Sequence, residues 1–188
     1  MAIMTLGSAA TISQLDEGST ESIPCRAHFA QVRDTILRAF PWNWARRRVA
    51  LTNLGNPPSN WGFSYAYPTD CLQALSLVLP GARIPRRDLA PPFEIGNDGT
   101  RRVIYTDLAQ AELVYTGRVE NVALWDPLAQ EALVNLLASK IAMPLAVKPD
   151  LAQGAMNAYR VAMTMAAAQS LNEGHDLEPE SEFLTARR

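Results

Sequence analysis

Residues 126–143 have the sequence DPLAQEALVNLLASKIAM, and this stretch decides the fold of the C-terminal half. Asp126 followed by Pro127 is typical of a helix N-terminus, because Asp caps free backbone N–H groups and proline fits the first turn. Apolar residues then recur at steps of three and four, which predicts one buried face. They are Leu128, Ala132, Leu133, Leu136, Leu137 and Ile141.

A second helix is expected over 150–172, with Asp150 as a candidate cap. Between Leu151 and Leu171 its only charged residue is Arg160. A helix with so few charges has to be covered on most of its sides. In a chain of this size, another copy of the protein is one source of that cover.

An earlier helix is predicted over 22–40. Ser22, with Pro24 two places later, marks its start. Pro41 ends it, because the residue before a proline is pushed out of the α region. Its apolar stripe consists of Cys25, Phe29, Val32, Ile36 and Phe40.

The middle of the chain is expected to be rich in β-strands. Short apolar and aromatic segments alternate there with proline, glycine and asparagine, which is the pattern of strands joined by turns. Asn97-Asp98-Gly99 is a strong turn signal. The segment 71–79 also fits a short helix, but its length and flanking turns favour a strand. The expected strands or extended segments are 44–51, 63–67, 71–79, 93–95, 103–105 and 113–116.

These elements predict one α+β domain over 1–188. Its fold is expected to be a helical bundle with a β-rich insertion between the N-terminal and C-terminal helices. The insertion covers 44–120, the C-terminal helical pair covers 126–172, and an extended tail covers 173–188.

The composition fits a globular protein, since 48% of the 188 residues are apolar, 19% are charged and the net charge is −2. No apolar run approaches the roughly 20 residues that a membrane helix needs. The near-zero charge argues against holding nucleic acid by bulk electrostatics. The N-terminal apolar run is short and lacks a basic segment, so no secretory signal is expected. Arginine outnumbers lysine by 15 to 2, which suits protein interfaces but also follows from codon bias in a GC-rich genome.

No catalytic, cofactor-binding or metal-binding residue is predicted. Two cysteines and two histidines lack the spacing of a zinc site, and phosphate-binding glycine loops and a serine-hydrolase elbow are absent from the sequence. Cys25 and His28 are three residues apart on a predicted helix, but Cys25 belongs to the apolar stripe. The scattered carboxylates leave glycosidase chemistry open.

Aromatic and basic residues follow one another closely after the first helix. Trp42 and Trp44 only superficially resemble a stacking platform for single-stranded nucleic acid, and a role in a core or an interface is favoured. The triplet Arg46-Arg47-Arg48 lies on an expected strand, where at most two of the three can meet one partner. A solvated or intersubunit role is favoured over phosphate contact.

The segment 33–45, RDTILRAFPWNWA, resembles a motif of the head-to-tail adaptors of short-tailed bacteriophages, also called tail tubular protein A or head completion proteins. Similar segments occur in the same order along 13–172, and this order carries the resemblance. The N-terminal helix that some members have is reduced here. The other similar segments are 13–21, 67–72, 105–107, 113–116 and 125–142.

The resemblance implies a structural virion protein with no enzymatic role and no cofactor. Copies of such adaptors, typically about twelve, form a ring beneath the portal protein, and the tail nozzle protein attaches to this ring. Genomic DNA passes through the channel without specific binding, and no membrane is involved. The protein is expected in the neck of the virion after assembly in the host cytoplasm.

Two interfaces are predicted within this framework. The tail 173–188 is expected to dock on the portal through Phe183, Leu184, Arg187 and Arg188, with a solubilising end as the alternative. The region 81–102 is expected to face the nozzle or the adjacent subunit through Arg86, Arg87, Arg101 and Arg102. Two other functions remain as alternatives: a virion-associated peptidoglycan-degrading enzyme and a DNA-binding packaging ring protein.

Overall fold

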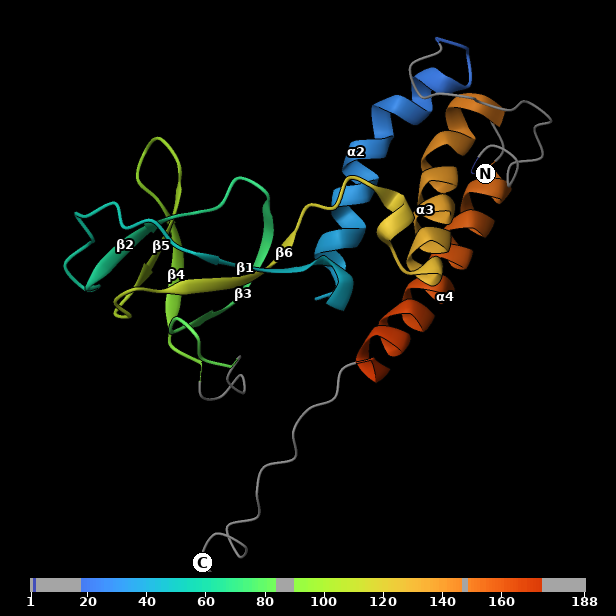
Figure 1. Cartoon of the computed structure of the whole chain (residues 1–188). Helices are drawn as coiled ribbons and strands as arrows, with labels where there is room; N and C mark the ends of the chain where they lie inside the picture. The colour runs from blue at the N-terminus through green and yellow to red at the C-terminus, as the bar shows by residue number, and fades with distance from the viewer. Residues whose placement is uncertain (1, 3–17, 84–89, 147–148, 174–188) are drawn as a thin grey trace, which may run out of the picture.

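The computed structural model describes residue 2 and residues 18–83, 90–146 and 149–173, and this part of the chain is α+β (Figure 1). The helices are α2 (Ser22–Ala39), α3 (Pro127–Ala146) and α4 (Pro149–Asn172), with short 3-10 turns η1 (Asn43–Ala45) and η3 (Val122–Leu124). The strands are β1 (Arg46–Ala50), β2 (Phe63–Ala66), β3 (Cys71–Val78), β4 (Phe93–Asn97), β5 (Arg102–Thr106) and β6 (Glu112–Gly117).

The ends of the helices follow local signals. The Asp126 carboxylate accepts hydrogen bonds from the backbone N–H groups of Leu128 at 2.8 Å and Ala129 at 3.3 Å, so it caps α3 as predicted. At the start of α2, the Ser22 hydroxyl donates to the Ser19 carbonyl at 3.0 Å. The three predicted helical segments are confirmed, because caps and prolines act within a few residues of the chain.

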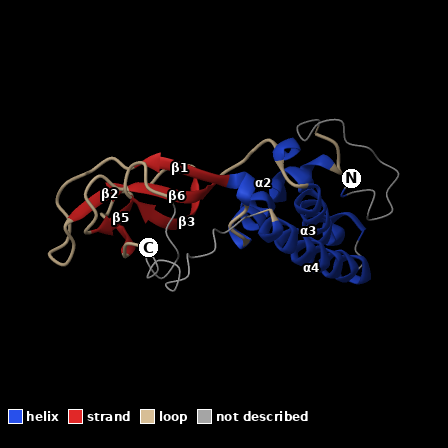
Figure 2. Ribbon diagram, turned by 60° about the horizontal axis from the view of Figure 1, so that its bottom comes forward, coloured by secondary structure: helices blue, strands red, loops and turns tan. Residues whose placement is uncertain are grey.

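The predicted helical bundle is wrong. Two of the three described helices, α3 and α4, follow the strands, and the helices form an open layer (Figures 1 and 2). Within this layer α3 packs against both neighbours, whereas α2 and α4 barely contact each other. The reason lies in α4, whose buried face consists of the small residues Ala155, Ala162, Ala166 and Ser170. Because α4 packs on α3 and hardly reaches α2, the three helices form a layer whose shared core lies along α3.

The described strands form two antiparallel three-stranded sheets, with orders β1-β6-β3 and β2-β5-β4 (Figure 2). Each expected extended segment overlaps one of these strands, and 71–79 is a strand as favoured. The strands β4, β5 and β6 are longer than predicted. The predicted turn joins β4 to β5. There Gly99 has a φ of 93°, and the Asp98 carboxylate accepts the N–H groups of Thr100 and Arg101, both at 2.9 Å.

One strand begins later than predicted, because the tryptophans before it belong to the core. The Trp42 indole is fully buried and donates to the Ile36 carbonyl at 2.8 Å. Its ring centroid lies 5.6 Å from that of Trp44, which lies 5.0 Å from that of Trp125. This stack places residues 43–45 in the turn η1, so β1 starts at Arg46. The favoured role of Trp42 and Trp44 as core aromatics is confirmed.

The described residues bury two separate apolar cores. The helical core surrounds α3 and includes Trp42, Trp125 and Ile141. The β core brings residues of both sheets together, among them Tyr65, Ile104 and Leu113. The helical layer meets the β part where α2 contacts β3 and β6. Surfaces near this junction are therefore built from both halves of the fold.

Trp42→Ala is expected to lower the free energy of unfolding by about 3–5 kcal/mol, because it empties a fully buried site in the aromatic stack. Urea unfolding followed by far-UV circular dichroism measures this loss. Trp61→Ala is the matched control, since that indole is only half-buried in a loop of the β part. Equal losses of unfolding free energy in the two variants would contradict the conclusion that burial of Trp42 in the aromatic stack stabilises the helical core.

Candidate assembly surfaces

The outer side of α4 is an apolar strip that the described residues leave exposed. Val161 and Met165 are each 55% exposed in its middle, at one helical turn from each other. Small exposed residues flank this pair, and the polar side chains of Asn157 and Thr164 border it on the same side of the helix. The outer strip of α4 is defined here as Gly154, Ala158, Val161, Met165 and Ala168.

Few polar groups interrupt the outer strip. Arg160 is the only charged residue between Leu151 and Leu171, and its guanidinium donates to the Asn157 side chain at 3.3 Å. The hydroxyl of Thr164 donates to the Arg160 carbonyl at 3.0 Å, so it is satisfied within the helix. A shallow hollow of about 300 Å³ is lined by Val161, Met165, Thr164 and Arg160. The surface therefore offers apolar contact at Val161 and Met165, with the single charge of Arg160 at its border.

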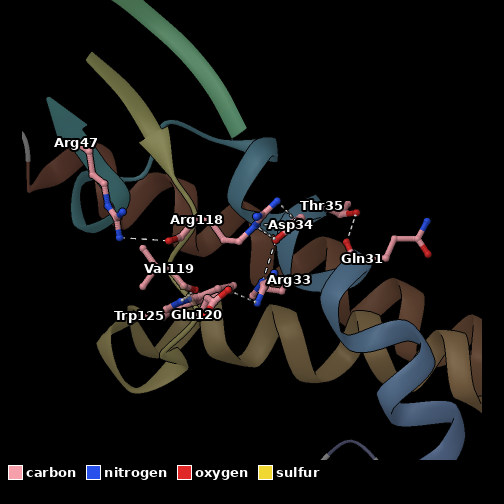
Figure 3. A network of polar contacts seen from close by, with 9 residues as sticks. All are labelled: Gln31, Arg33, Asp34, Thr35, Arg47, Arg118, Val119, Glu120 and Trp125. Carbon is pink, nitrogen blue, oxygen red and sulfur yellow. Dashed lines mark hydrogen bonds and ion pairs between the residues drawn. The ribbon is translucent and has the colours of Figure 1, made fainter. Parts of the chain in front are cut away.

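An ion network joins the helical layer to the β part (Figure 3). The Asp34 carboxylate on α2 accepts a hydrogen bond from the guanidinium of its neighbour Arg33 at 2.9 Å. It also pairs, at 3.1 Å, with the guanidinium of Arg118, which lies on the segment after β6. Arg33 also lies 3.8 Å from Glu120. Arg47 on β1 donates to the Arg118 carbonyl at 3.2 Å, which extends the network into the sheet. The network holds α2 against the segment that leads into α3.

Beside this network lies an open cleft of about 550 Å³ between α2 and the β part. We call it the arginine cleft, because the charged residues that line it are Arg38, Arg101, Arg102, Arg118 and Asp34. The Arg102 guanidinium carbon lies 4.0 Å from the ring centroid of Tyr67, in a cation–π arrangement. Burial raises the pKa of Tyr67 to about 12, and the neighbouring Cys71 thiol acts in the same direction.

The predicted interface residues are only partly within the described chain. Arg101 and Arg102 are exposed and line the arginine cleft, where Arg101 also lies 3.5 Å from Asp98. Arg38, Arg118 and Tyr67 were not predicted, because sequence spacing carries no signal that these distant residues meet. Six predicted residues lie outside the described residues: Arg86, Arg87, Phe183, Leu184, Arg187 and Arg188.

Two other sequence features have roles inside the chain. In the arginine triplet, Arg47 pairs with Asp70 and Arg48 with Glu112, so these two side chains brace the edge of a sheet. The predicted solvated or intersubunit role did not anticipate this.

Cys25 is buried in the helical core, and burial raises the pKa of its thiol, which is the reverse of nucleophile activation.

Comparisons with known proteins add no assignment. No protein-family model matches the chain, and no curated protein matches it at a significant level. Within the described ranges, no group of three or more His, Cys, Asp or Glu side chains is placed to hold a metal ion. No described helix combines the length and apolar character needed to cross a bilayer.

Asp34→Ala is expected to lower the free energy of unfolding by about 1 kcal/mol, because it leaves Arg33 and Arg118 facing each other without the shared carboxylate. The loss should shrink in 1 M salt, which screens partly exposed charges. Glu131→Ala is the control, since Glu131 is exposed on α3 and makes no polar contact within the described residues. A salt-independent loss, or equal losses in both variants, would argue against the network.

Tyr67→Phe should reduce the alkaline loss of stability while keeping the ring under Arg102. The folded pKa of about 12 exceeds the ordinary value of 10.0, so this hydroxyl contributes fully below pH 10 and its contribution fades between pH 10 and 12. Unfolding free energies at pH 9 and pH 11.5 test this. The variant should lose less stability than the wild type between these values, and an identical loss would refute the assignment.

Proposed function

We propose that this chain is a structural head-to-tail adaptor of a short-tailed bacteriophage. Copies form a ring beneath the portal, the tail nozzle attaches to the ring, and genomic DNA passes through the channel without specific binding. The outer strip of α4 is the observation that carries the proposal, because apolar helix surface of this kind requires a partner. The sequence resemblance over 33–45 supplies the class of assembly.

The layered arrangement of the helices suits a head-to-tail contact between copies. α3 lies between α2 and α4, so the two flanking helices have outer sides that face away from each other (Figure 1). A contact between the α4 side of one copy and the α2 side of the next is head-to-tail. Repeated with the right rotation, such a contact closes into a ring.

Exposed apolar residues outside α4 are also available for this contact. Ile23 on α2 is 62% exposed, and Leu124 on η3 is 65% exposed. Stable protein interfaces bury roughly 800 Å² on each partner, more than one helix strip supplies. The ring contact therefore draws on further surface of the two neighbouring copies, with the outer strip of α4 as its apolar centre.

The two ends of the ring have different partners in this proposal. The tail 173–188 docks on the portal, with Phe183 and Leu184 as apolar anchors and Arg187 and Arg188 pairing with acidic groups. The region 81–102 faces the nozzle or the adjacent subunit, and it contributes Arg86, Arg87, Arg101 and Arg102.

Val161→Asp combined with Met165→Asp should prevent ring formation, because each copy contact would then bury two unpaired carboxylates. The measurement is the number of copies retained on purified portal-bearing heads, and we expect at least about a tenfold decrease. Unfolding of the isolated variant should change by no more than about 2 kcal/mol, the loss expected for two aspartates one turn apart on an exposed helix face.

Leu79→Asp is the matched control. Leu79 is 52% exposed and directly follows β3, so it lies outside the outer strip of α4. This variant should load onto heads at the wild-type level. Normal loading of the double α4 variant, with its fold intact, would overturn the proposed ring contact.

A further inference from the structure

The arginine cleft has more positive charge than its own carboxylate can balance. Four arginines and one aspartate are the charged residues lining it. Asp34 is already engaged by Arg33 and Arg118. Within the part of the chain that the structure describes, no carboxylate pairs with Arg38 or Arg102. The cleft is thus prepared for an acidic ligand, because guanidinium groups bind carboxylates through paired hydrogen bonds.

The chain itself contains a segment of matching charge. Residues 173–182 hold five carboxylates and neither lysine nor arginine. The carboxylates are spread over ten positions of the sequence and are not adjacent to one another. They belong to Glu173, Asp176, Glu178, Glu180 and Glu182.

The end of α4 lies close enough to the cleft for this segment to reach it. The Asn43 side-chain amide donates to the Ser170 carbonyl, and the Asn43 backbone N–H donates to the Ser170 hydroxyl at 3.4 Å. Arg38 precedes Asn43 by five positions, so their Cα atoms are separated by at most about 18 Å. The stretch 174–182 spans up to about 30 Å when extended.

We infer that the acidic segment 173–182 binds in the arginine cleft of its own chain when the subunit is free. Each ion pair at an exposed site contributes little alone, but several pairs act together on a segment that is covalently tethered. The tether gives an effective concentration in the millimolar range. Residues 183–188 lie beyond this segment and stay available to another partner.

The test uses the isolated full-length chain at low salt, with no portal or capsid, so its failure leaves the proposed ring untouched. Backbone NMR order parameters of residues 176–182 should exceed roughly 0.6 and fall below it in 0.5 M salt. Arg38→Glu combined with Arg102→Glu should cause the same decrease at low salt. Arg46→Glu combined with Arg160→Glu makes the matched double charge reversal at exposed positions outside the cleft, and should leave the order parameters unchanged.

A charge swap distinguishes pairing from indirect effects. Asp176→Lys, Glu178→Lys and Glu180→Lys should release the segment from the wild-type cleft and restore its order in the Arg38→Glu, Arg102→Glu background. Unchanged signals from the β core would show that each variant is folded. Release without restoration in the combined variant would refute direct pairing.

A nitroxide attached through Ser181→Cys tests whether the bound segment belongs to the same chain as the cleft. Broadening of the Arg102 NMR signals by the nitroxide of the same molecule supports the inference. Broadening only between labelled and unlabelled copies would overturn it in favour of exchange between subunits. Order parameters below roughly 0.6 in the wild type, with inorganic phosphate shifting the Arg102 signals, would overturn it in favour of a site for small anions.

Discussion

The contact between α3 and α4 determines which surface of the helical layer remains exposed to solvent. α4 is attached to α3 through small residues, among them Ala155, Ala162 and Ala166. Small side chains let the two helices approach closely, and the larger Met156, Tyr159 and Met163 of α4 also pack against the helical core. Since α2 packs on a different side of α3, no element of the described chain covers the outer strip of α4. In a free subunit this apolar surface faces water, and the proposed assembly covers it.

A second constraint is the rigid connection between the two cores. The stack of Trp42, Trp44 and Trp125 joins the end of α2 to the start of α3 within the helical core. The ion network around Asp34 then holds the segment after β6 against α2 (Figure 3). A subunit of a ring has to present several surfaces in fixed relation to one another. The apolar stack and the ion network together provide that relation here, and Asp34 and Arg118 of the network also line the arginine cleft.

Local signals in the sequence were enough to find the elements but not their arrangement. Asp126 and Pro41 determine helix ends through groups a few residues away, and the turn at 97–99 joins two strands for the same reason. The bundle prediction failed because the low charge of α4 indicates only that the helix needs cover. It does not say whether that cover comes from the same chain. The arginine cleft was equally invisible, since Arg38 and Arg102 meet only through the packing of α2 on the sheets.

A cryo-electron microscopy map of the neck of an intact particle tests the central claim most directly. The account predicts a ring of this chain immediately beneath the portal, with Val161 and Met165 of each copy buried against the α2 side of its neighbour. A map that places the chain elsewhere in the particle, or that shows a ring with the outer strip of α4 facing solvent, would contradict it.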